Sequence, residues 1–276
     1  MTLRETYEYG KEQLNIAGIP EFELDAWYLL EHVTGMNRTQ YFLNSDVEVD
    51  ESKLQLYREY ISKRMLRIPL QHLTGVQEFM GLEFDVNEHV LIPRQDTEIL
   101  VESVLEELKP GMDVLDMCTG SGCILLSLLH YGKGSQGVGV DISKEALAVA
   151  AQNAKKHNIV ATFVESNLFD KVDGKYDVIV SNPPYIRTAV IEELQEEVRL
   201  HDPRLALDGM EDGLYFYDRI IEESPAFLKP QGKLYFEIGH DQGEAVKKRM
   251  EEAGFTSVTV KKDLAGLDRV VFGVYI

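Results

Sequence analysis

The chain has 276 residues, enough for one large domain or two. Its formal net charge is −19, with 28 Lys and Arg against 47 Asp and Glu, which argues against simple nucleic-acid binding because phosphate-tracking proteins usually carry a basic surface. No apolar run approaches the roughly 18 residues that a membrane span needs. The start "MTLRETYEYGKEQ" has no apolar signal core, so we expect a cytoplasmic protein. The two cysteines and seven scattered histidines lack metal-binding spacing, and we expect no metal site.

Residues 1 to 75 have the apolar periodicity of three short amphipathic helices. Breaks at Gly18 and Pro20, at Gly35 and at Pro69 separate or end them. The three apolar stripes are Leu3, Tyr7 and Leu14; Phe22, Ala26, Leu29, Leu30 and Val33; and Leu54, Tyr57, Ile61 and Met65. This region has no cluster of reactive side chains, so we expect a small helical bundle that serves as a recognition domain.

One basic segment stands out in this acidic chain. In "REYISKRMLR", Arg58, Lys63, Arg64 and Arg67 gather at the end of the third expected helix. They are explained either by favourable pairing of cations with a helix C-terminus or by a docking patch for a partner.

The period of the sequence changes between residues 76 and 92. Apolar residues then alternate, which predicts a β-hairpin that links two domains and bends at Asn87. The next segment, "DTEILVESVLEEL", is typical of a helix, with Asp96 or Thr97 as its N-cap.

From residue 93 to 276 we expect one α/β domain. Seven apolar segments alternate with amphipathic helices, which predicts a mainly parallel sheet covered on both faces. The last two segments have no helix between them, so we expect one of them to be an antiparallel edge strand. The expected strands are "DVLDM", "QGVGVDIS", "ATFVES", "YDVIVSN", "GKLYFEIG", "FTSVTVKKD" and "DRVVFGVYI".

The first expected strand runs into a glycine-containing loop, Thr119–Gly120–Ser121–Gly122, and then into a helix. Such a loop lets backbone approach a ligand at a helix N-terminus. The third position of a dinucleotide-type G-x-G-x-x-G motif is Leu125, and no Gly-Lys-Ser/Thr follows, so pyrophosphate and P-loop sites are disfavoured. About 20 residues later Asp141 ends a strand, where a carboxylate can accept both hydroxyls of a ribose; the alternative is that it only caps the helix near Ser143. Together these features predict an adenosine cofactor without a pyrophosphate.

The segment "YDVIVSNPPYI" ends a buried strand with Asn182, Pro183, Pro184 and Tyr185. The prolines fix two φ angles and remove two backbone donors. The Asn182 carboxamide oxygen and the Pro183 carbonyl can then accept the two N–H bonds of a planar amino or amide group, and Tyr185 can cover its flat face. The alternative is that two prolines merely end an edge strand.

The motif "NPPY" resembles that of S-adenosylmethionine-dependent methyltransferases that modify planar nitrogens. In order, "VLIPRQDTEILVE", "CTGSGCILLSL", "DISKEALAVAAQNA", "DVIVSNPPYI", "LALDGMEDGLYFYDRII" and "GKLYFEIGHDQ" resemble the HemK/PrmC family of protein-(glutamine-N5) methyltransferases. The resemblance covers essentially the whole chain.

This resemblance implies a Rossmann-like methyltransferase domain, S-adenosylmethionine as the cofactor, and as substrate the glutamine of the Gly-Gly-Gln loop in class 1 peptide chain release factors. From the lack of a long apolar run and from the acidic charge we also expect no membrane association and no direct nucleic-acid binding. Phe79 could form a wall of the substrate pocket. The implied cofactor residues are Cys118, Thr119, Gly120, Ser121, Gly122, Asp141, Leu168 and Asn182, and the implied catalytic residues are Asn182, Pro183, Pro184 and Tyr185.

The sequence departs from the family pattern at a few positions. Cys118 replaces the usual first glycine of the loop. We expect a cysteine to fit there only if its φ is negative. Gln95 and Asp96 replace Pro-Glu, and Asp202 stands where glutamate is common. Two other functions stay open: an amino-methyltransferase acting on adenine or guanine in nucleic acid, and an adenosine sensor without catalysis.

Overall fold

The computed structural model describes residues 1–276 in full. The chain forms two compact units. One contains Met1–Val76 together with Gln195–His201, and the other contains Gln77–Leu194 and Asp202–Ile276. No helix of the structure is both long enough and apolar enough to cross a membrane.

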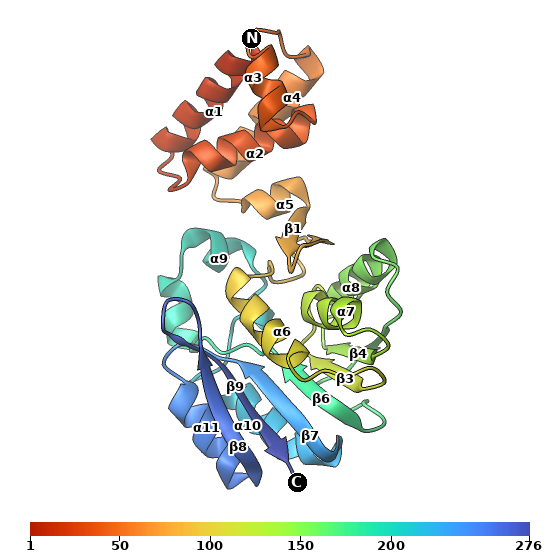
Figure 1. Ribbon diagram of the computed structural model, residues 1–276. Helices are drawn as coiled ribbons and strands as arrows, with labels where there is room; N and C mark the ends of the chain where they lie inside the picture. The colour runs from red at the N-terminus through yellow and green to blue at the C-terminus, as the bar shows by residue number, and fades with distance from the viewer. The chain divides into compact units, whose positions relative to one another are not determined.

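The smaller unit is helical (Figure 1). The three expected helices are confirmed as α1 (Leu3–Ile16), α2 (Phe22–Thr34) and α4 (Glu51–Met65), and α3 (Arg38–Asn44), α5 (Leu70–Thr74) and α9 (Glu196–His201) complete the unit. Capping boxes at Thr2 and Asn37 begin α1 and α3. The core is formed by the apolar faces of the helices, with Leu14, Leu29, Leu30, Tyr57 and Ile61 almost fully buried.

Two of the four cations of the basic segment, Arg64 and Arg67, are engaged within the helical unit. Arg64 is buried, and its guanidinium contacts Asp25 on α2 at 2.7 Å and Glu197 on α9 at 3.1 Å. Arg67 contacts Glu197 and Glu196, each at 3.3 Å. The docking interpretation is therefore wrong for these two residues, because their charges tie the distant segment α9 to the bundle.

The larger unit is built on a seven-stranded sheet in the order β5-β4-β3-β6-β7-β9-β8. The predicted α/β class is confirmed, because the five strands from β5 to β7 are parallel. The strands are β3 (Asp113–Met117), β4 (Gln136–Asp141), β5 (Thr162–Glu165), β6 (Tyr176–Ser181), β7 (Leu228–Glu237), β8 (Phe255–Lys262) and β9 (Asp268–Tyr275).

The expected antiparallel edge strand is corrected in one respect. The antiparallel strand is β9, which lies inside the sheet between β7 and β8. The edge strand β8 runs in the same direction as the parallel strands. After β7, the chain passes through α11 (Gly243–Glu252) and forms β8 at the edge, which leaves the position beside β7 empty. After the short turn that follows Lys262, β9 fills that position between β7 and β8.

Helices cover both faces of this sheet. Because side chains alternate along a strand, Leu115, Ile179 and Phe236 pack on one face and Val114, Val178 and Tyr235 on the other. The first face is covered by α10 (Tyr215–Glu223) and α11, and the second by α6 (Glu98–Leu105), α7 (Cys123–Tyr131) and α8 (Lys144–Lys156). Short 3₁₀ helices are η1 (Gln95–Thr97), η2 (Thr188–Glu193), η3 (Arg204–Ala206) and η4 (Ser224–Ala226).

The hairpin exists, but its turn lies earlier than expected. Strands β1 (Val76–Phe79) and β2 (Leu82–Asp85) are joined at Met80 and Gly81, whose φ angles of 52° and 69° are those of a tight hairpin turn. The segment around Asn87 is not a strand. Phe79 and Phe84 are buried in the core beneath α6 and α7, so the hairpin packs into the larger unit.

Candidate active site

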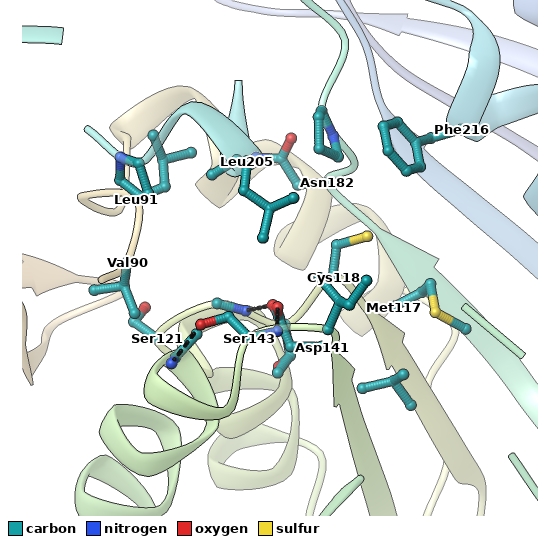
Figure 2. A pocket seen from close by; sticks show the side chains of 18 of the residues that line it. Val90, Leu91, Met117, Cys118, Ser121, Asp141, Ser143, Asn182, Leu205 and Phe216 are labelled. Atoms are coloured by element: carbon teal, nitrogen blue, oxygen red, sulfur yellow. Dashed lines mark hydrogen bonds between the residues drawn. The ribbon is translucent and has the colours of Figure 1, made fainter. Parts of the chain in front are cut away.

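A cavity of about 410 Å³ lies where β3, β4 and β6 end. Ligands of open parallel sheets bind at this edge, beyond the carboxyl ends of the strands. In Figure 2, Asp141 and Ser143 lie across the cavity from Leu91, and the Leu205 side chain projects into it. Of the predicted site residues, the structure brings eight to the lining: Cys118, Thr119, Gly120, Ser121, Asp141, Leu168, Asn182 and Pro184.

The loop after β3 has an unusual backbone. Cys118, Gly120 and Gly122 have φ angles of 63°, 53° and 79°, so our expectation of a negative φ at Cys118 is wrong. A left-handed conformation outside glycine costs about 1–3 kcal/mol. The turn is held by Thr119 N–H, which donates to the Val140 carbonyl at 2.9 Å, and by Gly122 N–H, which donates to the Thr119 carbonyl at 2.8 Å.

Burial makes the thiols of Cys118 and Cys123 poorly reactive. Burial raises the pKa of the Cys118 thiol far above its usual range, and burial raises that of Cys123 to about 12. Since the thiolate is the reactive form, neither cysteine is suited to be a nucleophile. Gly122 is favoured by its φ of 79°, and a Cβ there would lie 3.1 Å from the Ala150 Cβ, so a side chain would also require its neighbours to shift by a few tenths of an ångström.

Asp116 lies under the loop and was not singled out from the sequence. Its carboxylate accepts from the Thr119 hydroxyl at 2.6 Å and from Leu125 N–H at 3.3 Å, while its Oδ1 is buried with no hydrogen-bond partner. Burial raises the pKa of Asp116 to about 7, against those two hydrogen bonds. An acidic residue at the end of a buried strand was the available sequence signal.

Asp141 joins the loop to the start of α8. One carboxylate oxygen accepts from Gly120 N–H at 2.9 Å and the other accepts from Ser143 N–H at 2.9 Å. The cap of α8 is Ser143, whose hydroxyl accepts from Ala146 N–H, so Asp141 is not the helix cap. Burial raises the pKa of Asp141, and the backbone donors oppose that shift.

Asn182 lies at the end of β6, on the cavity. Its Nδ2 donates to the hydroxyl of Thr97 at 3.4 Å, which leaves its carboxamide oxygen as the acceptor available to a ligand. Thr97 is buried and makes no capping hydrogen bond with its side chain, and Asp96 lies within η1, so neither side chain caps α6 as predicted.

The remaining residues of the motif lie behind the cavity. Pro183 and Tyr185 are not among the lining residues, and the Tyr185 hydroxyl donates to Glu237 Oε1 at 3.3 Å. The segment from Leu207 to Gly213 braces this stretch, since Ile186 N–H donates to the Leu207 carbonyl and Gly209 N–H donates to the Ile186 carbonyl. A Cβ on Gly209 would lie 2.7 Å from the Tyr185 Cα, so only glycine allows this contact.

Other sequence expectations fail or were incomplete. Phe79 is 1% exposed and packs against Phe84 in the core, so it does not form a wall of the cavity. Gly122 does not line the cavity either. Lining residues that sequence reasoning missed include Val90, Leu91, Arg94, Leu205, Met210 and Phe216. Val90, Leu91, Arg94 and Met210 come from loops, where periodicity carries no information, whereas Leu205 belongs to the single turn η3 and Phe216 to the first turn of α10.

The larger unit has the architecture of S-adenosylmethionine-dependent methyltransferases: a seven-stranded, mostly parallel sheet with a glycine loop after its first strand and an acidic residue ending its second. Residues 94–199 match the model of the methyltransferase small domain. A methyltransferase from Pyrococcus furiosus shares this fold, with a TM-score of 0.57 at 19% identity over 78% of this chain and 100% of that one. A T. thermophilus 16S rRNA N2 G1207 methyltransferase, solved with AdoMet and guanosine, has a TM-score of 0.52 and 18% sequence identity. The match covers 73% of this chain and 50% of that one.

Sequence comparison narrows the class. Residues 5–75 match the model of the PrmC N-terminal domain. Release factor glutamine methyltransferases from Geobacter sulfurreducens and Caulobacter vibrioides are 40% and 39% identical, each over 99% of this chain and 96% of its own length. The release factor glutamine methyltransferase from Clostridium acetobutylicum is 42% identical over 91% of this chain and 90% of its own length. The chain belongs to the family of release factor glutamine methyltransferases.

Proposed function

We propose that this chain transfers a methyl group from S-adenosylmethionine to the side-chain amide nitrogen of the glutamine in the Gly-Gly-Gln loop of class 1 peptide chain release factors. The observation that carries this is the shared position of Asp141 and Asn182 on one cavity, with the Asn182 amide turned so that its oxygen is free. The names of the full-length relatives support the same reaction.

The cavity fits the adenosine part of the cofactor. A carboxylate oxygen has about two acceptor positions, so each Asp141 oxygen can accept a ribose hydroxyl beside its backbone N–H. Val90, Leu91, Ile142 and Leu168 offer apolar surface to a planar base. The Ser121 hydroxyl is buried on the lining with no hydrogen-bond partner, so it is available to a ligand. The bound cofactor supplies an electrophilic methyl group on a sulfonium.

The residues of the NPPY motif would act on the substrate amide. An amide nitrogen is a weak nucleophile because its lone pair is delocalised into the carbonyl. The Asn182 oxygen, which lies on the cavity, would accept one N–H bond of the amide and help to aim the nitrogen at the methyl group. The Pro183 carbonyl would accept the second N–H bond and Tyr185 would cover the amide plane only where the substrate reaches past the lining residues, because neither residue lines the cavity in this structure. Positioning of this kind can supply several kcal/mol. The nitrogen becomes strongly acidic after transfer, so its proton leaves without a dedicated base.

The helical unit would recognise the release factor. Its sequence has no cofactor-binding motif, and a macromolecular substrate needs contact area beyond one glutamine. Because release factors act in translation, we place the enzyme in the cytoplasm, without a membrane or direct nucleic-acid partner.

The test is transfer of label from methyl-labelled S-adenosylmethionine to purified class 1 release factor, with total RNA and heat-denatured release factor in parallel. We expect label on the native release factor only. Label on RNA alone would instead support an amino-methyltransferase of nucleic acid, and cofactor binding without any transfer would support a sensor.

A further inference from the structure

The segment from Asp202 to Met210 forms one wall of the cavity, and Pro203, Leu205, Ala206 and Met210 belong to the lining. Leu205 lies in the single turn η3, and its side chain projects into the cavity while it remains 53% exposed. Ligand cavities use apolar side chains of this kind to contact the carbon atoms of what they bind. The contacts proposed above for the ribose and for the amide nitrogen leave this wall without a role.

The start of the segment is tied to the loop that supports Asn182. The Arg94 guanidinium contacts the Asp202 carboxylate at 2.7 Å. Arg94 comes three residues before Thr97, whose hydroxyl accepts from the Asn182 carboxamide at 3.4 Å. Because the Asp202 side chain is only 1% exposed, little water reaches this end of the ion pair, and the pair holds the wall against that loop.

The end of the segment is tied to the backbone that follows the NPPY motif. Ile186 N–H donates to the Leu207 carbonyl at 3.0 Å, and Gly209 N–H donates to the Ile186 carbonyl at 2.8 Å. Leu205 is therefore held between two contacts, and each contact joins the wall to a segment that contains or adjoins a neighbour of Asn182.

In Figure 2, Leu205 and Asn182 lie on the same side of the cavity, across from Asp141. We propose that Leu205 is a substrate-binding residue that packs against the two methylene groups of the substrate glutamine while the amide reaches Asn182. The inference rests on the proposed function, which places the reacting nitrogen at the Asn182 oxygen and the cofactor ribose at Asp141. The carbon atoms of the glutamine are the part of the substrate that an apolar wall can hold.

This contact supplies a restraint that Asn182 cannot supply. A hydrogen bond to the Asn182 oxygen fixes only the end of the glutamine side chain. Packing of the methylene groups against Leu205 also restricts the torsions between the backbone and the amide, which keeps the nitrogen aligned with the methyl group. One methylene group more or less in an apolar pocket changes kcat/KM about 10- to 200-fold, so the contact favours glutamine over asparagine.

The test compares Leu205→Ala, which removes the branched end of the side chain, with Leu205→Met, which keeps an apolar side chain of similar volume. On native release factor, we expect Leu205→Ala to lower kcat/KM about 10- to 100-fold and Leu205→Met to stay within about threefold of wild type. The Kd for S-adenosylmethionine should stay within about twofold of wild type in both variants, because Asp141 is unchanged.

Leu267→Ala is the matched control, because Leu267 is 45% exposed in the same unit and does not line the cavity. Equal kcat/KM for Leu205→Ala and Leu267→Ala would overturn the inference. A rise in the Kd for S-adenosylmethionine as large as the loss in kcat/KM would also overturn it, because Leu205 would then pack against the cofactor. Failure of the wild-type enzyme to methylate release factor would instead overturn the proposed function itself.

Methyl NMR gives a readout that does not depend on turnover. With leucine methyl groups isotope-labelled and S-adenosylhomocysteine bound, the Leu205 signals are assigned by their loss in Leu205→Met. They should shift when release factor is added, and shift clearly less with a release factor whose Gly-Gly-Gln glutamine is replaced by glycine. Equal shifts with the two release factors, or no shift with either, would show that Leu205 does not contact the glutamine.

Discussion

At the residue scale, three carboxylates are buried at or near the candidate site, and each makes different contacts. Asp141 lies on the cavity with both oxygens bound to backbone N–H groups, whereas Asp116 lies below the loop and never reaches the lining. Glu237 lies behind the NPPY motif and contacts Tyr185. All three have a pKa raised by burial. Only Asp141 is placed to touch the cofactor.

Replacing Asp141 with Ala should weaken S-adenosylmethionine binding about 10- to 100-fold, because charge-assisted hydrogen bonds contribute about 1.5–3 kcal/mol. Isothermal titration calorimetry measures this directly. Glu165 is a matched control, since it is the neighbour of Asp141 in the β4–β5 register but does not line the cavity. Equal affinities for Asp141→Ala and Glu165→Ala would refute the ribose assignment.

The raised pKa of Asp116 predicts that the free energy of unfolding depends on pH. Its pKa is about 7 in the folded chain against an ordinary value of 3.8, so the folded state holds a proton that the unfolded state has lost. Between pH 4 and pH 7, its contribution to the free energy of unfolding must therefore fall as pH rises. We expect the Tm of Asp116→Asn, relative to that of wild type, to increase from pH 5 to pH 7 and level off above pH 7. A constant difference would contradict the raised pKa.

At the scale of elements, much of the fold was predictable from periodicity. Stripes such as Leu54, Tyr57 and Ile61 predicted α4, and continuous apolar runs predicted the strands of the sheet. Contacts that are remote in sequence were not predictable. Nothing in "QEEVRLH" indicates that Glu197 pairs with Arg64, and a residue of a single 3₁₀ turn such as Leu205 has no periodic pattern that places it on the cavity.

The site was predictable to a similar degree. Strand ends located Asp141 and Asn182 at one edge of the sheet, because parallel strands end together. The backbone of Cys118 was not predictable, since its positive φ depends on how the loop is held against β4. The contact of Thr97 with Asn182 was also hidden, because a threonine before a helical pattern is ordinarily interpreted as a cap.

Arg64 should matter for the stability of the helical unit. Burial raises the pKa of Asp25 and the Arg64 guanidinium opposes that rise, so Arg64→Ala leaves a buried carboxyl without its partner. We expect a loss of about 3–5 kcal/mol in the free energy of unfolding of this unit. Lys63→Ala is the control, because Lys63 pairs with Glu59 on the surface and its loss should cost less than about 1 kcal/mol. Similar denaturation midpoints for both variants would disprove the structural role of Arg64.

At the scale of the whole molecule, we propose that chemistry and recognition belong to different units. The larger unit contains the cavity, and the helical unit carries exposed apolar side chains, among them Phe42 and Leu43 at 70% and 79% exposure. Exposed apolar side chains of this kind are candidates for contact with a protein partner. The negative net charge of the chain suits a protein substrate better than a nucleic acid.

Replacing Phe42 and Leu43 together with Ser should raise the KM for release factor about 10-fold and leave kcat and cofactor affinity near wild type. Steady-state methylation with varied release factor measures this. Val160→Ser is the control, because Val160 is 93% exposed on the larger unit and has no assigned role. An unchanged KM in the double variant would place recognition on another surface.

The central claim is that Asn182 aligns the substrate amide for methyl transfer. Its most direct test is the kcat of Asn182→Ala on release factor, measured beside the Kd of the same variant for S-adenosylmethionine. The account predicts a loss of turnover of at least about 100-fold while the cofactor affinity stays within severalfold of wild type, because the missing acceptor acts mainly on the reacting nitrogen. A normal kcat with only a raised KM would contradict it.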